Sequence, residues 1–397
     1  MEQYMTLKKL ALMSILSASS LFSVHSFAAE QVPVQEFFVG TWTSESPSAV
    51  PSVTESQGIY RVRLNADGSL VALGSTSTIS PSWLAVSKDQ KTLYSTNEDG
   101  REINGGVSAF KIDADGNLKL LNRVDSQGQQ PAHAEVSPDE KYLLISNYSV
   151  SGRGAGVAVF ALNQDGSIGQ FVQNIAFGEG SKVIAERQAS GHAHSVTFTP
   201  DGKRVFLADL GGDVIRAYAY QANAKTPLKA TPEQNLRFPA GSGPRHLLFS
   251  KNGQYAYATT EMAAQVTVFA KKAGKYQLLQ QENLTTKTNA DTKSASGLLF
   301  SPDGKFLYVG NRGKTNEIVV YAVDAKTGRL TLSGQYNSGG AEPRAFAFDQ
   351  TGTYLFVSNV FSNTVSTFKR NAVDGSLTPT HTALQIGRPT DIKFIAK

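Results

Sequence analysis

The chain has 397 residues, of which 38 are Lys or Arg and 33 are Asp or Glu, and it contains no cysteine. The lack of cysteine excludes disulfide bonds and thiolate chemistry. The basic residues stand singly and are not interleaved with aromatic residues. The net charge of +5 therefore does not indicate a nucleic-acid groove, and we expect no nucleic-acid partner.

The first segment of the chain has the pattern of an export signal. Lys8 and Lys9 precede an apolar run over 10–24, and the small residues of Ser26-Phe27-Ala28 follow it. The run is short for a membrane-spanning helix, which needs about 20 apolar residues. We therefore predict a signal peptide over residues 1–28, cleaved before Ala29. The mature protein is expected in the periplasm or secreted, with no membrane attachment after cleavage.

One short pattern recurs along the rest of the chain. Complete copies begin at Pro81, Pro131, Ala193, Pro244, Ala295 and Pro343, and a truncated copy begins at Pro389. Each complete copy consists of an alternating strand, a polar turn such as Ser-Pro-Asp-Gly, and a second apolar strand, which is the signature of a β-hairpin. A period of roughly 50 residues built from strands alone is typical of a β-propeller.

Two further strands are expected after each hairpin, which makes four strands per blade. Examples are a third strand over 106–112 and a fourth over 118–121. The first-strand pattern of Pro389–Phe394 lacks a second strand, and Phe37–Thr41 is a second strand without a first, followed by a third over 58–64. Together these ends complete one blade. We predict an all-β, seven-bladed propeller over 29–397, a single domain closed by three N-terminal strands and one C-terminal strand, with 390–394 beside 37–41.

Three inserts between the repeats, over 44–57, 150–156 and 177–191, are predicted to be loops because they are rich in polar residues or glycine. The glycines of the second insert superficially resemble a phosphate cradle. They do not lie between a strand and a helix, so they do not predict nucleotide binding.

Ionisable residues gather at equivalent positions of the repeats. The innermost strand of a blade lines the central channel, and the start of this strand lies beside the end of the next one. Both positions should therefore face one mouth of the channel. They hold different polar groups from blade to blade, among them Glu98, His133, His194, Arg245, His246, Glu261, Arg312 and Arg344. We interpret this cluster as a binding or catalytic site; the alternative is that the groups only pair with one another and plug the channel.

Four segments resemble the seven-bladed lactonase family: GTWTSE near the N-terminus, RQASGHAHSVTFTPDG, the ADLGGD that follows it, and GSGPRHLLFSKNG. The best known activity of that family is 6-phosphogluconolactonase, and carboxy-muconate cyclases are relatives. The resemblance runs from about Phe37 to the C-terminus. Against the cyclase relatives, whose site uses a His, two Arg and a Glu, it implies a catalytic set of His194, Arg245, Glu261 and Arg312. We expect the substrate to be bound by the residues that the repeat alignment places around this set, His133, His246, Arg344 and Glu98, and by Arg187.

The resemblance implies hydrolysis of a lactone or anionic sugar-like substrate by water. Either Glu261 or His194 could be the base, while Arg245 and Arg312 could hold an oxyanion or a substrate carboxylate or phosphate. Export would separate the protein from phosphorylated cytoplasmic sugars. A serine nucleophile is not indicated, since the chain has no Gly-x-Ser-x-Gly motif.

Several alternatives stay open at this stage. We expect no cofactor, although His192 and His194 with Asp209 or Glu261 could hold a divalent metal. The protein could also be a non-catalytic propeller that binds a small anion or an envelope partner, or a muconate-type cycloisomerase. A monomer is expected.

Overall fold

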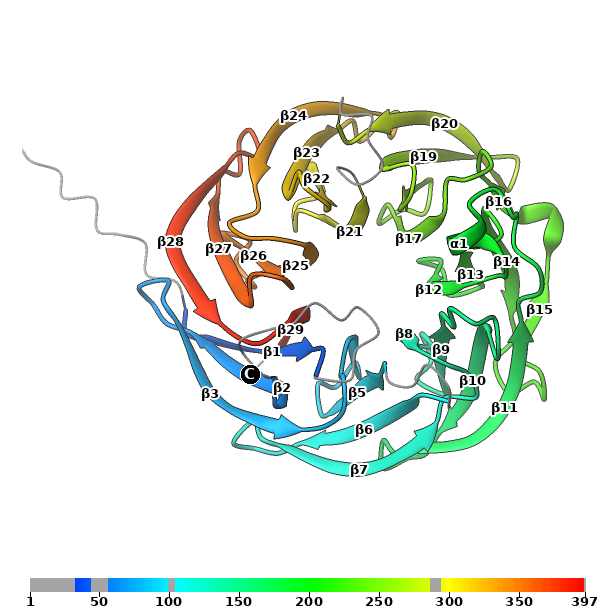
Figure 1. The fold of residues 1–397 in the computed structure, drawn as a ribbon, viewed down its shortest axis with the longest axis horizontal. Helices are drawn as coiled ribbons and strands as arrows, with labels where there is room; N and C mark the ends of the chain where they lie inside the picture. Colours follow the sequence, from blue (N-terminus) through cyan, green and yellow to red (C-terminus); the bar gives the residue numbers. More distant parts are fainter. Residues whose placement is uncertain (1–32, 44–55, 99–103, 286–293, 396–397) are drawn as a thin grey trace, which may run out of the picture. The chain divides into compact units, whose positions relative to one another are not determined.

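The computed structural model describes residues 33–43, 56–98, 104–285 and 294–395. The predicted signal peptide and its cleavage site lie outside the described residues. Strands dominate the described chain and form seven antiparallel sheets, which follow one another around a ring (Figure 1). The described chain contains no helix long and apolar enough to cross a bilayer.

Blade 1 combines the two ends of the ring. Its strand order is β29-β1-β2-β3, from the channel outward. The bounds are β29 (Pro389–Ile395), β1 (Gln35–Thr41), β2 (Gly58–Leu64) and β3 (Leu70–Ser77). Phe37 pairs with Phe394 and Val39 with Ile392. The predicted ring closure is thus confirmed, and it removes the two sheet edges that an open ring would expose.

The other six blades run in chain order from the innermost strand outward. Blades 2 and 3 are β4 (Leu84–Val86), β5 (Thr92–Asn97), β6 (Gly106–Ile112), β7 (Leu118–Asp125), and β8 (Pro131–Val136), β9 (Tyr142–Asn147), β10 (Gly156–Leu162), β11 (Ile168–Ala176). Blade 4 is β12 (Ala193–Phe198), β13 (Arg204–Asp209), β14 (Val214–Tyr220), β15 (Leu228–Ala230) and β16 (Leu236–Arg237). It differs from the prediction by the extra short strand β16, which pairs with β14.

Blades 5 to 7 complete the ring. They are β17 (Pro244–Phe249), β18 (Tyr255–Thr260), β19 (Gln265–Lys272), β20 (Lys275–Asn283); β21 (Ala295–Phe300), β22 (Phe306–Asn311), β23 (Glu317–Val323), β24 (Leu330–Asn337); and β25 (Pro343–Phe348), β26 (Tyr354–Asn359), β27 (Thr364–Arg370), β28 (Leu377–Gln385). The insert over 177–191, predicted as a loop, contains the one-turn helix α1 (Ala185–Gln188), and the 3-10 turn η1 (Pro232–Gln234) precedes β16.

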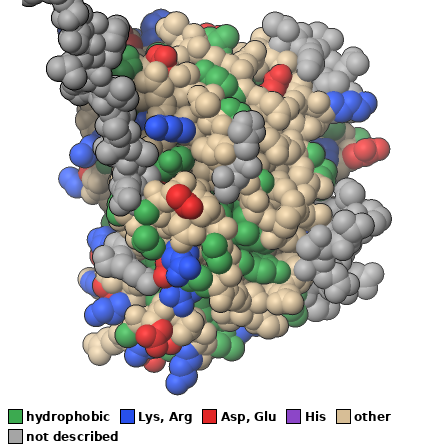
Figure 2. Space-filling view, turned by 90° about the vertical axis from the view of Figure 1, so that its left-hand side faces the viewer, with side chains coloured by type: hydrophobic (Ala, Val, Ile, Leu, Met, Phe, Trp, Pro, Cys, Tyr) green, Lys and Arg blue, Asp and Glu red, His purple; other side chains and the backbone are tan. Residues whose placement is uncertain are grey.

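The core lies between the blades. Among the described residues, buried apolar side chains form seven clusters, and each cluster joins two neighbouring blades. Each sheet packs against one neighbouring sheet on either side, so its strands bury apolar side chains on both faces. On the lateral face in Figure 2, basic and acidic side chains are interspersed with hydrophobic ones, in agreement with their scattered positions in the sequence.

Tight turns join the first two strands of the blades. Gly202, Gly253, Gly304 and Gly352 occupy the left-handed region in four of these turns, with φ between 65° and 71°. Glycine adopts this conformation without a steric penalty. Gln90 and Glu140 take the same place in blades 2 and 3, so the turn geometry is kept where the glycine is absent.

We predict that Phe37→Ala lowers the free energy of unfolding by about 4 kcal/mol, because it empties the seam between blades 1 and 7. The Phe37 ring lies 4.8 Å from Phe394 and 5.4 Å from Phe356. Urea unfolding measures the loss. Val373→Ala is the control; its side chain is 87% exposed, and its effect should stay below about 0.5 kcal/mol. Equal losses in the two variants would contradict the closure role.

Candidate active site

A repeated β-bulge directs side chains into the channel mouth. In blades 1, 3, 4, 5 and 7 the pairing of the first two strands shifts by one residue immediately after the start of the innermost strand. The residue left out of the ladder is Thr390, Ala132, His194, Arg245 or Arg344. A bulge leaves its extra residue unpaired and changes the direction of its side chain. Three of these five bulged residues are ionisable.

A second repeated feature ties the two ends of each hairpin together. In all seven blades the residue after the second strand donates its backbone N–H to the carbonyl of the residue that precedes the repeat copy, at 2.7–3.1 Å. The donors are Trp42, Glu98, Tyr148, Leu210, Glu261, Arg312 and Val360. These hydrogen bonds hold the residue after the second strand close to the start of the same repeat.

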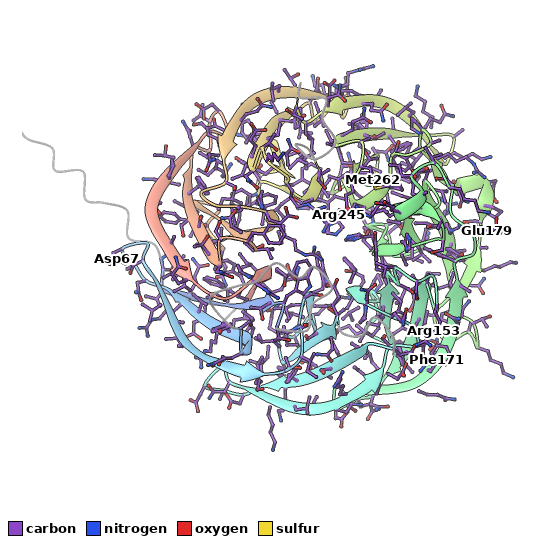
Figure 3. The ribbon with its side chains drawn as sticks, viewed as in Figure 1. Asp67, Arg153, Phe171, Glu179, Arg245 and Met262 are labelled. Carbon is purple, nitrogen blue, oxygen red and sulfur yellow. The ribbon has the colours of Figure 1, made fainter. Side chains whose placement is uncertain are left out.

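These residues surround a cavity of about 610 Å³ at the mouth. Six of the predicted site residues line it: Glu98, Arg187, His194, Glu261, Arg312 and Arg344. Trp42, Tyr148 and Glu342 line it as well, and the apolar residues Val150, Ile184, Met262 and Phe361 also contribute. In Figure 3, Arg245 and Met262 lie near the centre of the ring, whereas Asp67 and Glu179 lie at its periphery.

Glu261 is the charged centre of the cavity. Its Oε1 accepts from Arg187 at 2.5 Å, and its Oε2 lies 3.1 Å from Arg245 Nε and 3.0 Å from Arg312 Nη2. Burial alone would raise the pKa of Glu261, but Arg312, Arg187 and Arg245 outweigh it and hold the pKa well below its usual range. The carboxylate is therefore always ionised near neutral pH, and it is a poor proton acceptor.

His194 has the opposite character. It is buried, its Nε2 faces Glu261 Oε2 at 4.0 Å, and its Nδ1 has no hydrogen-bond partner within the described part of the chain. Burial, with Arg245, Arg344 and Arg312 nearby, lowers the pKa of His194 well below its usual value. The imidazole is therefore neutral near pH 7, and it lines the cavity with Nδ1 buried and Nε2 facing Glu261.

Arg245 lies below the cavity rather than on its wall. It is 1% exposed, and its Nη1 lies 3.2 Å from His246 Nε2. A guanidinium only donates hydrogen bonds, so His246 accepts at Nε2 and carries its proton on Nδ1. His246 packs edge-on against His133, and the His133 ring lies 4.2 Å from the Trp83 ring at a tilt of 31°. His133 and His246, predicted to bind substrate, form a layer beneath the cavity and do not line it.

Three residues on the opposite side complete the mouth. Trp42 donates from Nε1 to Glu98 Oε2 at 2.9 Å, and the guanidinium of Arg344 lies over the Trp42 ring at 4.3 Å. Arg344 reaches Glu98 only at 3.7 Å. Blades 7, 1 and 2 thus contribute an aromatic and charged wall that faces the residues of blades 4, 5 and 6.

Comparison with known proteins agrees with this architecture. The family model described as lactonase, 7-bladed beta-propeller, matches residues 36–394. The chain belongs to this family. A 6-phosphogluconolactonase of Formosa agariphila is 33% identical over 344 residues, covering 86% of this chain and 94% of the relative. A 6-phosphogluconolactonase of Bacillus subtilis is 30% identical over 364 residues, covering 90% and 97%.

Two solved structures are similar to this lactonase-family chain. The periplasmic gluconolactonase PpgL of Pseudomonas aeruginosa superposes with a TM-score of 0.84 at 36% identity, covering 91% of this chain and 99% of that one. A putative 6-phosphogluconolactonase of Bacteroides fragilis gives a TM-score of 0.81 at 31% identity, covering 91% and 98%.

The alternative metal set of the lactonase-family chain is not assembled. Asp209 accepts from Arg216 at 2.6 Å, and His192 Nδ1 lies 2.9 Å from the Tyr148 carbonyl. Across the described ranges, no three His, Asp or Glu side chains gather with the spacing of metal ligands. His192 precedes β12 and His194 is its bulged residue, so the two do not share a face as a regular strand would require.

Three wall residues were missed by sequence reasoning. Trp42 and Tyr148 occupy an aligned position that the repeats predict to face the mouth, but the predicted site included only the acids and the arginine at this position. Glu342 precedes its repeat and contacts Arg312 of the neighbouring blade at 2.9 Å. The sequence feature that could have identified Glu342 is its place directly before Pro343. Other blades have Ser80, Gln130 or Arg388 at this place, and all four residues have a left-handed backbone conformation.

A second group of charges lies on the innermost strands β8 and β29. Lys393 lies 3.5 Å from Asp391 Oδ2 and over the Trp83 ring. Burial raises the pKa of Glu135 to about 7, although the nearby charge of Lys393 acts against this rise. An acid with a raised pKa in the folded state loses its proton later than in the unfolded chain. It therefore destabilises the fold increasingly as the pH rises from about 4.5 to 7.

We predict that Glu135→Gln removes this penalty. The variant should gain about 1 to 3 kcal/mol of stability over the wild type at about pH 8, and little at about pH 4. Urea unfolding at both pH values measures the difference. Glu233→Gln, which removes an exposed carboxylate of η1, serves as the charge control. A gain for Glu135→Gln that does not depend on pH would refute the assignment.

Proposed function

We propose that this chain hydrolyses the ester bond of a sugar-type lactone in the channel mouth. The observation that carries the proposal is a neutral imidazole, His194, in the same cavity wall as the guanidinium of Arg312. A base and an oxyanion donor around one cavity are the two elements that ester hydrolysis by water requires. The activities named for the relatives support the same reaction class.

His194 is the better base of the two candidates. When its proton lies on the buried Nδ1, the lone pair of Nε2, which faces Glu261, can accept a proton from water in the cavity. The resulting hydroxide oxygen adds to the lactone carbonyl carbon. The imidazolium that forms is stabilised by the ionised Glu261 at 4.0 Å. Glu261 itself cannot take this proton readily, because three guanidiniums hold it as a carboxylate.

The arginines receive the negative charge of the reaction. The guanidinium of Arg312 lines the cavity, and Arg187 reaches the cavity from α1 with its side chain 42% exposed. Either can donate to the oxyanion formed at the carbonyl oxygen. When the tetrahedral intermediate collapses, the ring C–O bond breaks and the imidazolium returns its proton to the leaving alkoxide. The product is an open-chain hydroxy acid.

His194→Ala should lower kcat/KM for the best sugar lactone by about 10² to 10⁴, because it removes the base. The kcat/KM of the wild type should not change as the pH falls from 7 through 6.5, the ordinary pKa of an imidazole. It should fall only at a more acid pH, because the pKa of His194 is lowered. His192→Ala, which removes an imidazole bonded to a backbone carbonyl, should cost less than about tenfold by comparison. A His194→Ala variant with more than a tenth of the wild-type rate would exclude this base.

A chelator in the same assay tests the further proposal that the reaction needs no metal. Full activity after dialysis against the chelator is the expected result. Loss of activity that returns with one divalent cation would replace the imidazole base by a metal-bound hydroxide.

We also propose that the protein acts as a monomer outside the cytoplasm after cleavage before Ala29. The basic residues and apolar run at the N-terminus support export, and one structural relative is described as periplasmic. Mass spectrometry of protein from the periplasmic fraction should give a chain that begins near Ala29. An intact N-terminus on the cellular protein would overturn the proposal of export.

A further inference from the structure

The cavity is electrically divided into two sides, and this division bears on the substrate. On the first side, contributed by blades 4 to 6 and α1, Arg187, Arg245 and Arg312 surround the single carboxylate of Glu261. On the second side, contributed by blades 7, 1 and 2, Glu98 and Glu342 accompany the single guanidinium of Arg344. The first side is therefore electropositive, and the second carries more negative than positive charge.

Each carboxylate of the second side has one oxygen that receives no hydrogen bond from a described residue. Glu98 uses Oε2 for Trp42, and Glu342 uses Oε1 for Arg312. No described residue donates to Glu98 Oε1 or Glu342 Oε2. Glu98 and Glu342 both line the cavity, so these two oxygens can accept hydrogen bonds from a ligand there. A ligand that brings donors therefore gains hydrogen bonds on this side.

Arg344 is also incompletely paired. It is 9% exposed, lies over Trp42, and makes no hydrogen bond within the described part of the chain; its nearest carboxylate oxygen is 3.7 Å away. Burial lowers the pKa of Arg344, with Glu98 acting against it, but a guanidinium stays charged. The second side thus offers one donor group between two acceptor groups.

This pattern fits hydroxyl groups better than a phosphate. Each hydroxyl donates one hydrogen bond and accepts others, so a polyhydroxyl chain satisfies both Glu98 and Glu342 and can accept from Arg344. A phosphate dianion has no proton to donate and would stand beside two carboxylates, and like charges brought together in a desolvated site oppose binding.

We propose that the second side holds the uncharged, hydroxylated end of the lactone, and that Glu98 and Glu342 select against a phosphorylated end. This inference rests on the proposed function and deepens it. The same asymmetry orients the substrate, because the carbonyl that becomes an oxyanion points to the arginines around Glu261 while the hydroxyl donors point to the opposite wall.

The test compares two substrates that differ only at that end: a neutral six-carbon aldonolactone and the same lactone with a terminal phosphate. The wild type should favour the neutral lactone at least tenfold in kcat/KM. The double variant Glu98→Gln/Glu342→Gln keeps the shape and removes both charges, so this preference should fall at least tenfold. Glu98→Gln alone gives the same comparison if the double variant does not fold, which circular dichroism reports. Glu233→Gln, outside the mouth, is the control and should keep the wild-type preference.

A wild-type preference for the phosphorylated lactone would overturn the inference, and so would a preference that the double variant leaves unchanged. If neither lactone is hydrolysed, the proposed function fails, and the inference is decided by calorimetry with the two open-chain acids. Tighter binding of the unphosphorylated acid, weakened relative to the phosphorylated acid in Glu98→Gln, supports the inference. Tighter binding of the phosphorylated acid by the wild type overturns it.

Discussion

The pairing of β1 with β29 is the interaction on which the rest of the molecule depends. It joins segments from the two ends of the described chain into one sheet, and the core between blades 7 and 1 forms only when both are present. It also builds part of the cavity. Trp42 follows β1 directly, and its backbone N–H is held by the carbonyl of Arg388 just before β29. The wall that carries Trp42 therefore exists only in the closed ring.

Within the closed ring, the carboxylate of Glu261 organises the mouth. Three guanidiniums from α1, blade 5 and blade 6 converge on it, and without a shared anion they would repel one another in a poorly solvated site. The same arrangement withdraws Glu261 from proton transfer and leaves that task to His194. Glu261 thus carries a fixed negative charge, while the neighbouring His194 takes up and releases the proton. The three guanidiniums lower the pKa of Glu261, whereas burial is the main cause that lowers the pKa of His194.

The repeats made the ring and the gathering of polar groups at one mouth predictable, because strand alternation and turn signals are local properties of the sequence. What the sequence did not reveal depends on contacts between blades. His133 and His246 occupy aligned positions, yet they lie in a layer under the cavity, since depth along the channel follows from side-chain packing. Glu342 lay outside the aligned copies, and its importance comes from Arg312 of another blade. The ionisation of Glu261 depends on three separate segments. The export signal stays a prediction.

The bulge at the start of the innermost strands has an evolutionary consequence. Its extra residue takes no part in the hydrogen-bond ladder, so Ala132, His194, Arg245 and Arg344 can share one backbone geometry while differing in every chemical property. Exchange at such a position changes the reaction surface and leaves strand register intact. A lineage of these rings can therefore acquire a new substrate range through a few substitutions at the mouth, while the seven interfaces that hold the ring together are inherited unchanged.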